Sequence, residues 1–140
     1  LIDLDHFKEV NDTLGHAAGD SLLQDVAERL RQGVRQSDIV ARFAGDEFVV
    51  VLPDAGTPEQ IASILAKLRA SLQAPFLGGG VEWPITASIG VASYPQDGTE
   101  PYALLQAADE AMYAVKRSTR DAYRFYRPPT GEATVDAGKT

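Results

Sequence analysis

The chain has 140 residues, 44% of them hydrophobic, and carries a formal net charge of -7 at pH 7. This length and apolar content predict one compact domain with its own core. The negative charge argues against a nucleic-acid backbone or an anionic membrane as the main partner, because both are bound through clustered Lys and Arg side chains. A small nucleotide is compatible with it, since a metal ion and a few cations neutralise its phosphates.

Cysteine is absent from the sequence, which excludes disulfides and thiolate metal sites. No apolar run reaches the roughly 18 residues that cross a bilayer, and no signal peptide is recognisable. We therefore expect a cytoplasmic segment without membrane contact, and an inner-membrane anchor elsewhere in the complete protein stays open. The chain begins with Leu1 and Ile2, an apolar pair typical of the middle of a β-strand. We therefore also expect its amino-terminal part to be missing.

The first third of the chain predicts a strand, a loop and a helix. Apolar and acidic residues alternate over residues 1–5, as in a short strand, and a polar loop is expected over residues 6–19. Apolar residues then recur at three- and four-residue spacing up to Val34, which predicts a helix that begins at Asp20 as its N-cap.

The remaining elements follow from turn and capping signals. Thr57 and Gln60 have the spacing of a capping box, and Pro58 suits the first helical position. The predicted elements are a hairpin with strands 39–43 and 48–52 and an acidic tip, a helix over 58–72, a glycine turn at 78–80, a strand over 85–91, a turn at 95–98, a helix over 104–115, a short strand at 123–125 and a linker over 128–140. This order predicts an α+β domain over residues 1–127, with helices flanking a largely antiparallel sheet.

Four carboxylates are expected at one end of this sheet. Asp3 and Asp5 end the first strand, whereas Asp46 and Glu47 lie at the hairpin tip, so they converge if the two strands are neighbours. Hard oxygen ligands of this kind suit Mg²⁺ shared with substrate phosphates. Two such ions about 3.5–4 Å apart activate a hydroxyl and stabilise a leaving oxygen. Taken singly, each acid has the alternative of being an ordinary solvated side chain.

Three further pairs each have a functional and a structural interpretation. Lys116 and Arg120 suit a polyphosphate, or they complement a helix macrodipole. Asn11 and Asp20 suit a guanine edge, or they cap the local backbone. Arg35 and Asp38 suit a phosphate-bearing ligand, or they form a surface ion pair.

Five motifs follow one another along the chain. They are Asp3-Leu4-Asp5-His6-Phe7-Lys8 with Asn11-Asp12, Gly15-His16 with Gly19-Asp20, Arg42-Phe43-Ala44-Gly45-Asp46-Glu47-Phe48, Ser88-Ile89-Gly90-Val91-Ala92, and Ala108-Asp109-Glu110-Ala111-Met112-Tyr113 with Lys116. In order and spacing they resemble the GGDEF family of diguanylate cyclases, and the resemblance extends to about Tyr126. It implies a fold like the palm of nucleotide cyclases and polymerases. It also implies a homodimer in which each domain presents one GTP, so that cyclic di-GMP and two pyrophosphates are formed.

The same resemblance implies a role for each site residue. Mg²⁺, or Mn²⁺ in its place, would be held by carboxylates and one backbone carbonyl, and the 3′-hydroxyl of one GTP would attack the α-phosphate of the other. Asp3, the Leu4 carbonyl, Asp46 and Glu47 would bind the metal. Asp46 and Glu47 would be catalytic, and Glu47 would assist deprotonation of the 3′-hydroxyl or hold the second metal. The triphosphate would be bound by the amides of His6 and Phe7 with Lys8, Lys116 and Arg120, and guanine by Asn11 and Asp20. Arg35 and Asp38, which match an RxxD motif, would bind the inhibitory product.

The chain departs from the family pattern in three places. Ala44 stands at the first glycine of the signature, where a left-handed backbone would cost alanine about 1 kcal/mol. Thr119 stands where the pattern has a glycine before Arg120, which would shift the turn that aims this arginine. The family's amino-terminal helix, with its DxLTxLxNR motif, is absent.

Two other functions stay open at this level. One is a degenerate GGDEF module that binds GTP or cyclic di-GMP and regulates an attached sensory or EAL phosphodiesterase domain; aromatic residues before a proline-rich exit, Tyr123, Phe125 and Tyr126, favour an EAL neighbour. The other is a different palm-type nucleotidyl cyclase with another base pocket.

Overall fold

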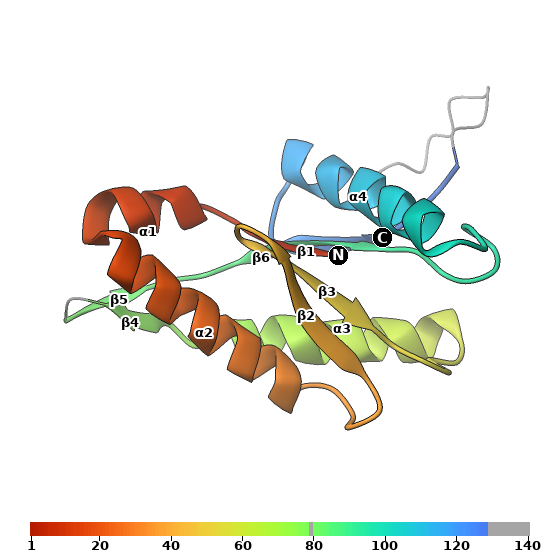
Figure 1. The fold of residues 1–140 in the computed structure, drawn as a ribbon, viewed down its shortest axis with the longest axis horizontal. Helices are drawn as coiled ribbons and strands as arrows, with labels where there is room; N and C mark the ends of the chain where they lie inside the picture. Colours follow the sequence, from red (N-terminus) through yellow and green to blue (C-terminus); the bar gives the residue numbers. More distant parts are fainter. Residues whose placement is uncertain (79, 129–140) are drawn as a thin grey trace. The chain divides into compact units, whose positions relative to one another are not determined.

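The computed structural model describes residues 1–78 and 80–128, so nearly all of the predicted linker at 128–140 lies outside the described residues. The chain divides into two compact units. The first is Ile2–Ala87, and the second consists of Leu1 together with Ser88–Thr140. Both are drawn in Figure 1.

The first unit is a three-stranded antiparallel sheet with helices and a separate hairpin (Figure 1). Strand β3 pairs with β1 on one side and with β2 on the other. Its elements are β1 (Ile2–Leu4), α1 (Phe7–Leu14), α2 (His16–Gln32), β2 (Ile39–Ala44), β3 (Glu47–Val51), α3 (Pro58–Leu72), β4 (Phe76–Gly78) and β5 (Val81–Trp83). The predicted hairpin at 39–52 and helix at 58–72 are confirmed.

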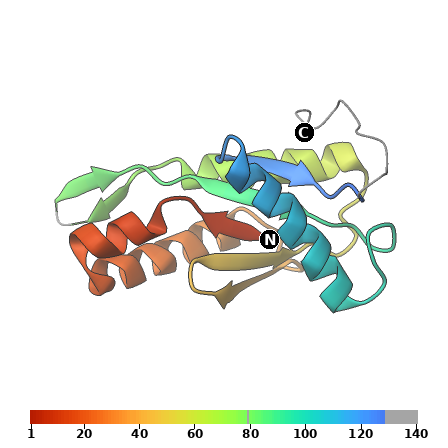
Figure 2. The same cartoon turned by 90° about the horizontal axis from the view of Figure 1, so that it is seen from above.

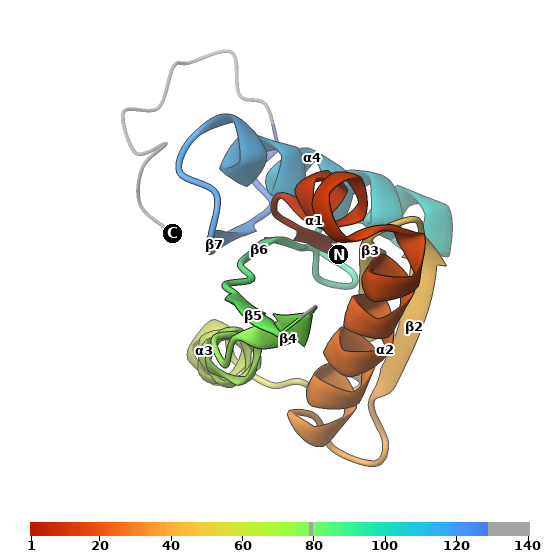
Figure 3. The same cartoon turned by 90° about the vertical axis from the view of Figure 1, so that its left-hand side faces the viewer.

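The core of the first unit lies against one face of this sheet. Ile2 lies directly opposite Phe48 across β1 and β3, and both side chains are 1% exposed. Helix α2 packs against β2 and α3 (Figure 3) and adds Val26 and Leu30 to the core. Each such buried side chain contributes about 1.5–3 kcal/mol. Because side chains alternate along a strand, residues between the core positions point to the other face.

The prediction of a loop over residues 6–19 is wrong, because α1 and the start of α2 occupy it. Phe7, Val10 and Leu14 recur at helical spacing within a sequence that is otherwise polar, which concealed the periodicity. Gly15, with a φ of 91°, makes the break between the two helices. Asp20 is therefore not an N-cap; it lies in the second turn of α2, which begins at His16.

The capping box at the start of α3 is confirmed. The Thr57 hydroxyl accepts a hydrogen bond from the Gln60 amide at 3.2 Å, and the Gln60 side chain accepts one from the Thr57 amide at 2.8 Å. These bonds satisfy two of the amide donors that every helix leaves open at its start.

The hairpin β4–β5 was not predicted, because strands of three residues are too short to show alternation. Of the glycine turn expected at 78–80, Gly78 ends β4 and Gly80, with a φ of 78°, precedes β5, whereas residue 79 lies outside the described residues. Arg29 of α2 secures the chain before β4: its guanidinium donates to the carbonyls of Leu72, Ala74 and Pro75 and forms an ion pair with Asp25.

The second unit contains β6 (Ala87–Val91), α4 (Pro101–Arg117) and β7 (Ala122–Phe125), with β6 starting on the last residue of the first unit. Strands β6 and β7 are parallel, and α4 provides the crossover between them (Figure 2). A Cβ atom on Gly90 would lie 1.9 Å from the Ala108 carbonyl oxygen, so only glycine lets α4 approach so closely. Leu1 exchanges two backbone hydrogen bonds with Gly90.

The predicted fold class, α+β with mostly antiparallel pairing, is confirmed. Strand β3 is antiparallel to both β1 and β2, and β4 is antiparallel to β5, whereas β6 and β7 run parallel. Within the described residues, no helix combines the length and apolar character needed to cross a membrane.

Candidate active site at the tip of the β2–β3 hairpin

Two carboxylates face each other across neighbouring strands of the first unit. Asp3 of β1 lies directly opposite Glu47 of β3, and both residues are half-buried. Directly opposed residues in an antiparallel pair have Cβ atoms about 4.5–5.5 Å apart. Both side chains point to the face opposite the core pair Ile2 and Phe48. Two negative charges so placed favour a cation between or beside them.

Asp46 and Leu4 bring further oxygen atoms to the same end of the strands. The Leu4 amide donates to the Asp46 carbonyl at 3.2 Å, which fixes the end of β1 against the hairpin tip. The described residues contain no group of three His, Asp or Glu side chains able to hold a metal unaided. Carboxylates and a backbone carbonyl are nevertheless the hard donors that Mg²⁺ takes, and this ion commonly uses one or two carboxylates with water and substrate phosphates. The donors therefore fit a metal shared with a substrate.

The hairpin tip tolerates Ala44 in place of glycine. Ala44 is the last residue of β2 and pairs with Glu47, whereas the left-handed φ of 47° belongs to Gly45. The backbone cost considered for alanine therefore does not arise. The register shifts between Arg42 and Ala44, and the Arg42 Nε donates to the Gly45 carbonyl at 2.9 Å, which braces the turn.

Asp5 does not share the half-exposed setting of Asp3 and Glu47. It lies beyond the end of β1, where strand alternation no longer applies, and is only 4% exposed. Its carboxylate accepts a hydrogen bond from the Thr86 hydroxyl at 2.7 Å. Thr86 was not predicted from the sequence, because nothing local marks a residue 81 positions away as the partner of Asp5.

The segment His6–Phe7–Lys8 forms the start of α1. His6 precedes the helix in a left-handed conformation, with φ 62°, and no side chain caps the helix amides. Uncapped amides at a helix start suit an anion. The His6 and Lys8 side chains are exposed, and His6 Nδ1 lies 3.3 Å from a Glu9 carboxylate oxygen.

The two residues predicted to bind guanine lie on adjacent helices. Asn11 belongs to α1, and a Cβ on Gly19 of α2 would lie 1.8 Å from the Asn11 side-chain oxygen. The Asn11 amide therefore rests on the backbone of Gly19, directly beside Asp20, which is exposed. The close approach of α1 and α2 thus places the Asn11 side chain against the backbone one residue before Asp20.

Arg35 and Asp38 form a well-defined pair between α2 and β2. The guanidinium donates to the two Asp38 carboxylate oxygens at 3.3 and 3.0 Å and to the Pro53 carbonyl at 2.6 Å. The hydrogen bond from Arg35 lowers the pKa of Asp38, and the same bond raises the pKa of Arg35. The Asp38 side chain is 1% exposed, whereas that of Arg35 is 52% exposed. A hollow of about 430 Å³ adjoins the pair, and Gln60 and Lys67 also line it.

Lys116 and Arg120 belong to the second unit. Lys116 lies in the last turn of α4, and the Arg120 amide donates to the Val115 carbonyl at 2.9 Å. The left-handed conformations at this helix end fall on Arg120 and Asp121, with φ 52° and 45°, and not on Thr119. Thr119 therefore does not need the conformational freedom of glycine here, whereas Arg120 takes a conformation that is strained for most residues.

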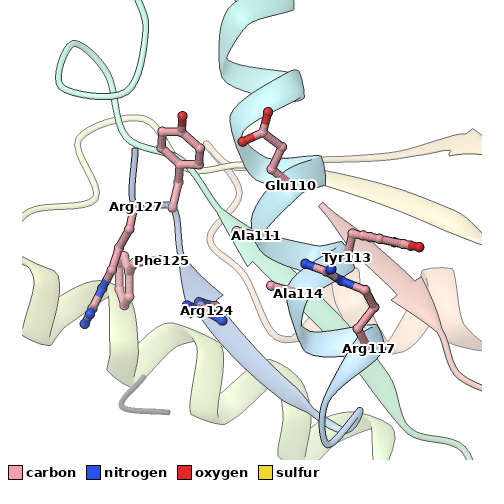
Figure 4. A pocket seen from close by; sticks show the side chains of 9 residues that line it. Glu110, Ala111, Tyr113, Ala114, Arg117, Arg124, Phe125 and Arg127 are labelled. Atoms are coloured by element: carbon pink, nitrogen blue, oxygen red, sulfur yellow. The ribbon is translucent and has the colours of Figure 1, made fainter. Parts of the chain in front are cut away.

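The second unit also has a hollow of about 310 Å³ between α4 and β7. Arg117 and Arg124 come from the two elements that border it (Figure 4), and Arg117 lies 4.9 Å from the centre of the Tyr113 ring. None of the residues predicted to form the active site lines this hollow.

This chain belongs to the GGDEF family: the family model described as diguanylate cyclase, GGDEF domain, matches residues 1–122. It is 46% identical over 126 residues to the diguanylate cyclase TpbB of Pseudomonas aeruginosa, a match that covers 89% of this chain and 29% of TpbB. It is 45% identical over 126 residues to the bifunctional diguanylate cyclase/cyclic di-GMP phosphodiesterase MucR of the same species, covering 90% of this chain and 18% of MucR.

A solved structure agrees with the sequence relationship. The GGDEF domain of PA1120 (YfiN or TpbB) from Pseudomonas aeruginosa has a TM-score of 0.87 and 43% identity, covering 91% of this chain and 80% of that one. The chain spans less than a third of the length of TpbB and of MucR.

Proposed function

We propose that the complete protein is a diguanylate cyclase, which condenses two GTP molecules into cyclic di-GMP and two pyrophosphates as a homodimer. The observation that carries the proposal is the carboxylate pair Asp3 and Glu47, opposed across β1 and β3. The backbone of Asp46 is fixed at the same end, because its carbonyl accepts from the Leu4 amide. Family membership and the similarity to TpbB support the same activity.

In the proposed reaction, the ribose 3′-oxygen of one GTP attacks the α-phosphorus of the other. The new O–P bond forms as the bond to pyrophosphate breaks, and Glu47 assists removal of the 3′-hydroxyl proton. Asp3, Asp46, Glu47 and the Leu4 carbonyl would hold Mg²⁺, or Mn²⁺ in its place. When bound, such an ion supplies charge neutralisation and Lewis acidity at phosphate oxygens.

Substrate recognition is assigned within this proposal to residues around α1 and α2. The amides of His6 and Phe7 and the Lys8 side chain would bind the triphosphate, because helix-start amides and an ammonium both favour anions. Lys116 and Arg120 enter the triphosphate assignment through the family resemblance alone. Asn11 and Asp20 would read guanine, which offers both donors and acceptors.

Arg35 and Asp38 are proposed as the site through which cyclic di-GMP inhibits. A guanidinium that is 52% exposed and held in place by Asp38 is oriented to bind phosphate. Replacing Arg35 with Ala should relieve inhibition by added cyclic di-GMP and leave the initial rate within about twofold of wild type. Lys67→Ala tests the rest of the hollow, and unchanged inhibition in Arg35→Ala would reject this assignment.

A degenerate module that binds GTP or cyclic di-GMP is the second candidate, because Ala44 adds a methyl group at the tip. The deciding experiment incubates the complete protein with GTP and Mg²⁺ and identifies the products by chromatography and mass. Cyclic di-GMP supports the cyclase. Retained binding without product supports the regulatory module, and equal turnover of ATP and GTP supports another nucleotidyl cyclase.

A further inference from the structure

Asp5 is a buried acid for which the proposed reaction has no direct use. Counted over the whole residue, it is only 4% exposed. Two of its atoms bind Thr86: the Asp5 amide donates to the Thr86 carbonyl at 2.9 Å, and its carboxylate accepts from the Thr86 hydroxyl at 2.7 Å. Burying a carboxylate is costly unless it is hydrogen-bonded. The Thr86 hydroxyl supplies such a hydrogen bond to Asp5.

The contact fixes the chain where it leaves β1. The Leu4 amide binds the Asp46 carbonyl on one side, and the next amide, that of Asp5, binds Thr86 on the other. Immediately afterwards His6 takes its left-handed conformation and α1 begins. The peptide groups of residues 4 to 6 are thus held between the hairpin tip and the segment before β6.

We propose that Asp5 and Thr86 are positioning residues for the metal and triphosphate ligands on either side of Asp5. They would set the direction of the Leu4 carbonyl and of the amides at His6 and Phe7. This inference rests on the proposed function, since it assumes that these backbone groups meet the nucleotide. Neither side chain is assigned a contact with substrate, so the effect is on ligand geometry, where small displacements weaken binding strongly.

The test compares Thr86→Val, Thr86→Ser and Asp5→Asn in the complete protein. Valine keeps the branched shape and removes the hydroxyl, serine restores the hydroxyl, and asparagine keeps an oxygen that accepts from Thr86. Isothermal titration calorimetry gives the affinity for a non-reacting GTP analogue with Mg²⁺, and for cyclic di-GMP as an internal control. Urea unfolding reports the stability of each variant.

We expect Thr86→Val to weaken analogue binding by about tenfold, the scale of one lost hydrogen bond to a charged group. Cyclic di-GMP affinity should change by less than about twofold, because Arg35 and Asp38 lie outside this contact. Thr86→Ser should return the analogue affinity to near wild type, and Asp5→Asn should fall between the two.

Equal analogue affinity in Thr86→Val and wild type would overturn the positioning role. The role would also be overturned if the affinities for the analogue and for cyclic di-GMP fell together, in proportion to the loss of free energy of unfolding. That result would show that the contact is purely structural. Turnover of the wild-type protein is measured in the same samples. If it binds the analogue but makes no cyclic di-GMP, the cyclase is rejected, while the variants still decide the role of Asp5 and Thr86.

Discussion

At the scale of residues, the acidic pair is the feature on which the proposed chemistry depends most directly. Its members come from β1 and from the hairpin, and the register of β1 with β3 places Asp3 opposite Glu47. The sequence predicted both strands and their acidic ends. It did not predict that Asp5 would be buried against Thr86, because that contact joins residues 81 positions apart through tertiary structure.

Replacing Glu47 with Gln should lower the rate of cyclic di-GMP formation by at least about 100-fold. The amide has the shape of the acid but does not accept the 3′-hydroxyl proton. General acid or base catalysis by one side chain typically raises a reaction rate by about 10²–10⁴-fold. The measurement is the initial rate at saturating GTP and Mg²⁺. Glu59→Gln, on an exposed turn of α3, is the matched control and should keep wild-type activity. A Glu47→Gln enzyme with more than a tenth of wild-type activity would contradict the role.

The Arg35–Asp38 pair predicts a pH dependence of stability. The pKa of Asp38 is lowered in the folded state by the Arg35 hydrogen bond, from an ordinary value of 3.8. The ionised form is therefore stabilised by folding, so the contribution is fully present above pH 3.8 and is lost as the pH falls through the lower folded value. The difference in free energy of unfolding between wild type and Asp38→Asn should stay constant from pH 7 to 5 and shrink below about pH 4. Urea titrations at each pH measure it, and a constant difference down to pH 3 would rule the mechanism out.

At the scale of elements, the regular segments were predictable and the short ones were not. The helices α3 and α4 and the hairpin β2–β3 carry strong periodicity or turn signals. Helix α1 has only three apolar residues within eight, and its polar appearance suggested a loop. Because the sequence does not reveal α1, Asp20 resembles the start of α2, although this helix begins at His16. Strands β4 and β5 have three residues each, too few for alternation to be recognised.

The capping box of α3 makes a prediction at the same scale. Thr57→Ala removes the hydroxyl that accepts from the Gln60 amide and should lower the free energy of unfolding by about 1 kcal/mol. Thr57→Ser keeps an acceptor and should lose less than half of that. Chemical unfolding followed by circular dichroism measures both. Equal losses in the two variants would mean that the threonine methyl, and not the cap, carries the effect.

At the scale of the whole molecule, the proposed reaction needs two copies of the chain. Each copy has one set of the residues assigned to the metal and one pair assigned to guanine, whereas the product contains two guanosine units. One domain that presents one GTP therefore cannot complete cyclic di-GMP by itself. The sequence motifs imply this arrangement through the family resemblance, but no property of a single chain fixes how tightly two copies associate.

The complete protein should therefore show a rate per chain that depends on its concentration. Well below the dimer dissociation constant, the fraction of chains in dimers rises in proportion to concentration, so the initial rate per chain should rise linearly and then reach a plateau. Sedimentation velocity at the same concentrations identifies the transition, and saturating GTP ensures that substrate binding is not limiting. Adding excess Glu47→Gln protein should lower the wild-type rate, because mixed dimers have only one intact acid pair. A constant rate per chain among monomers would show that one chain suffices, and would rule out the proposed division of the reaction between two domains.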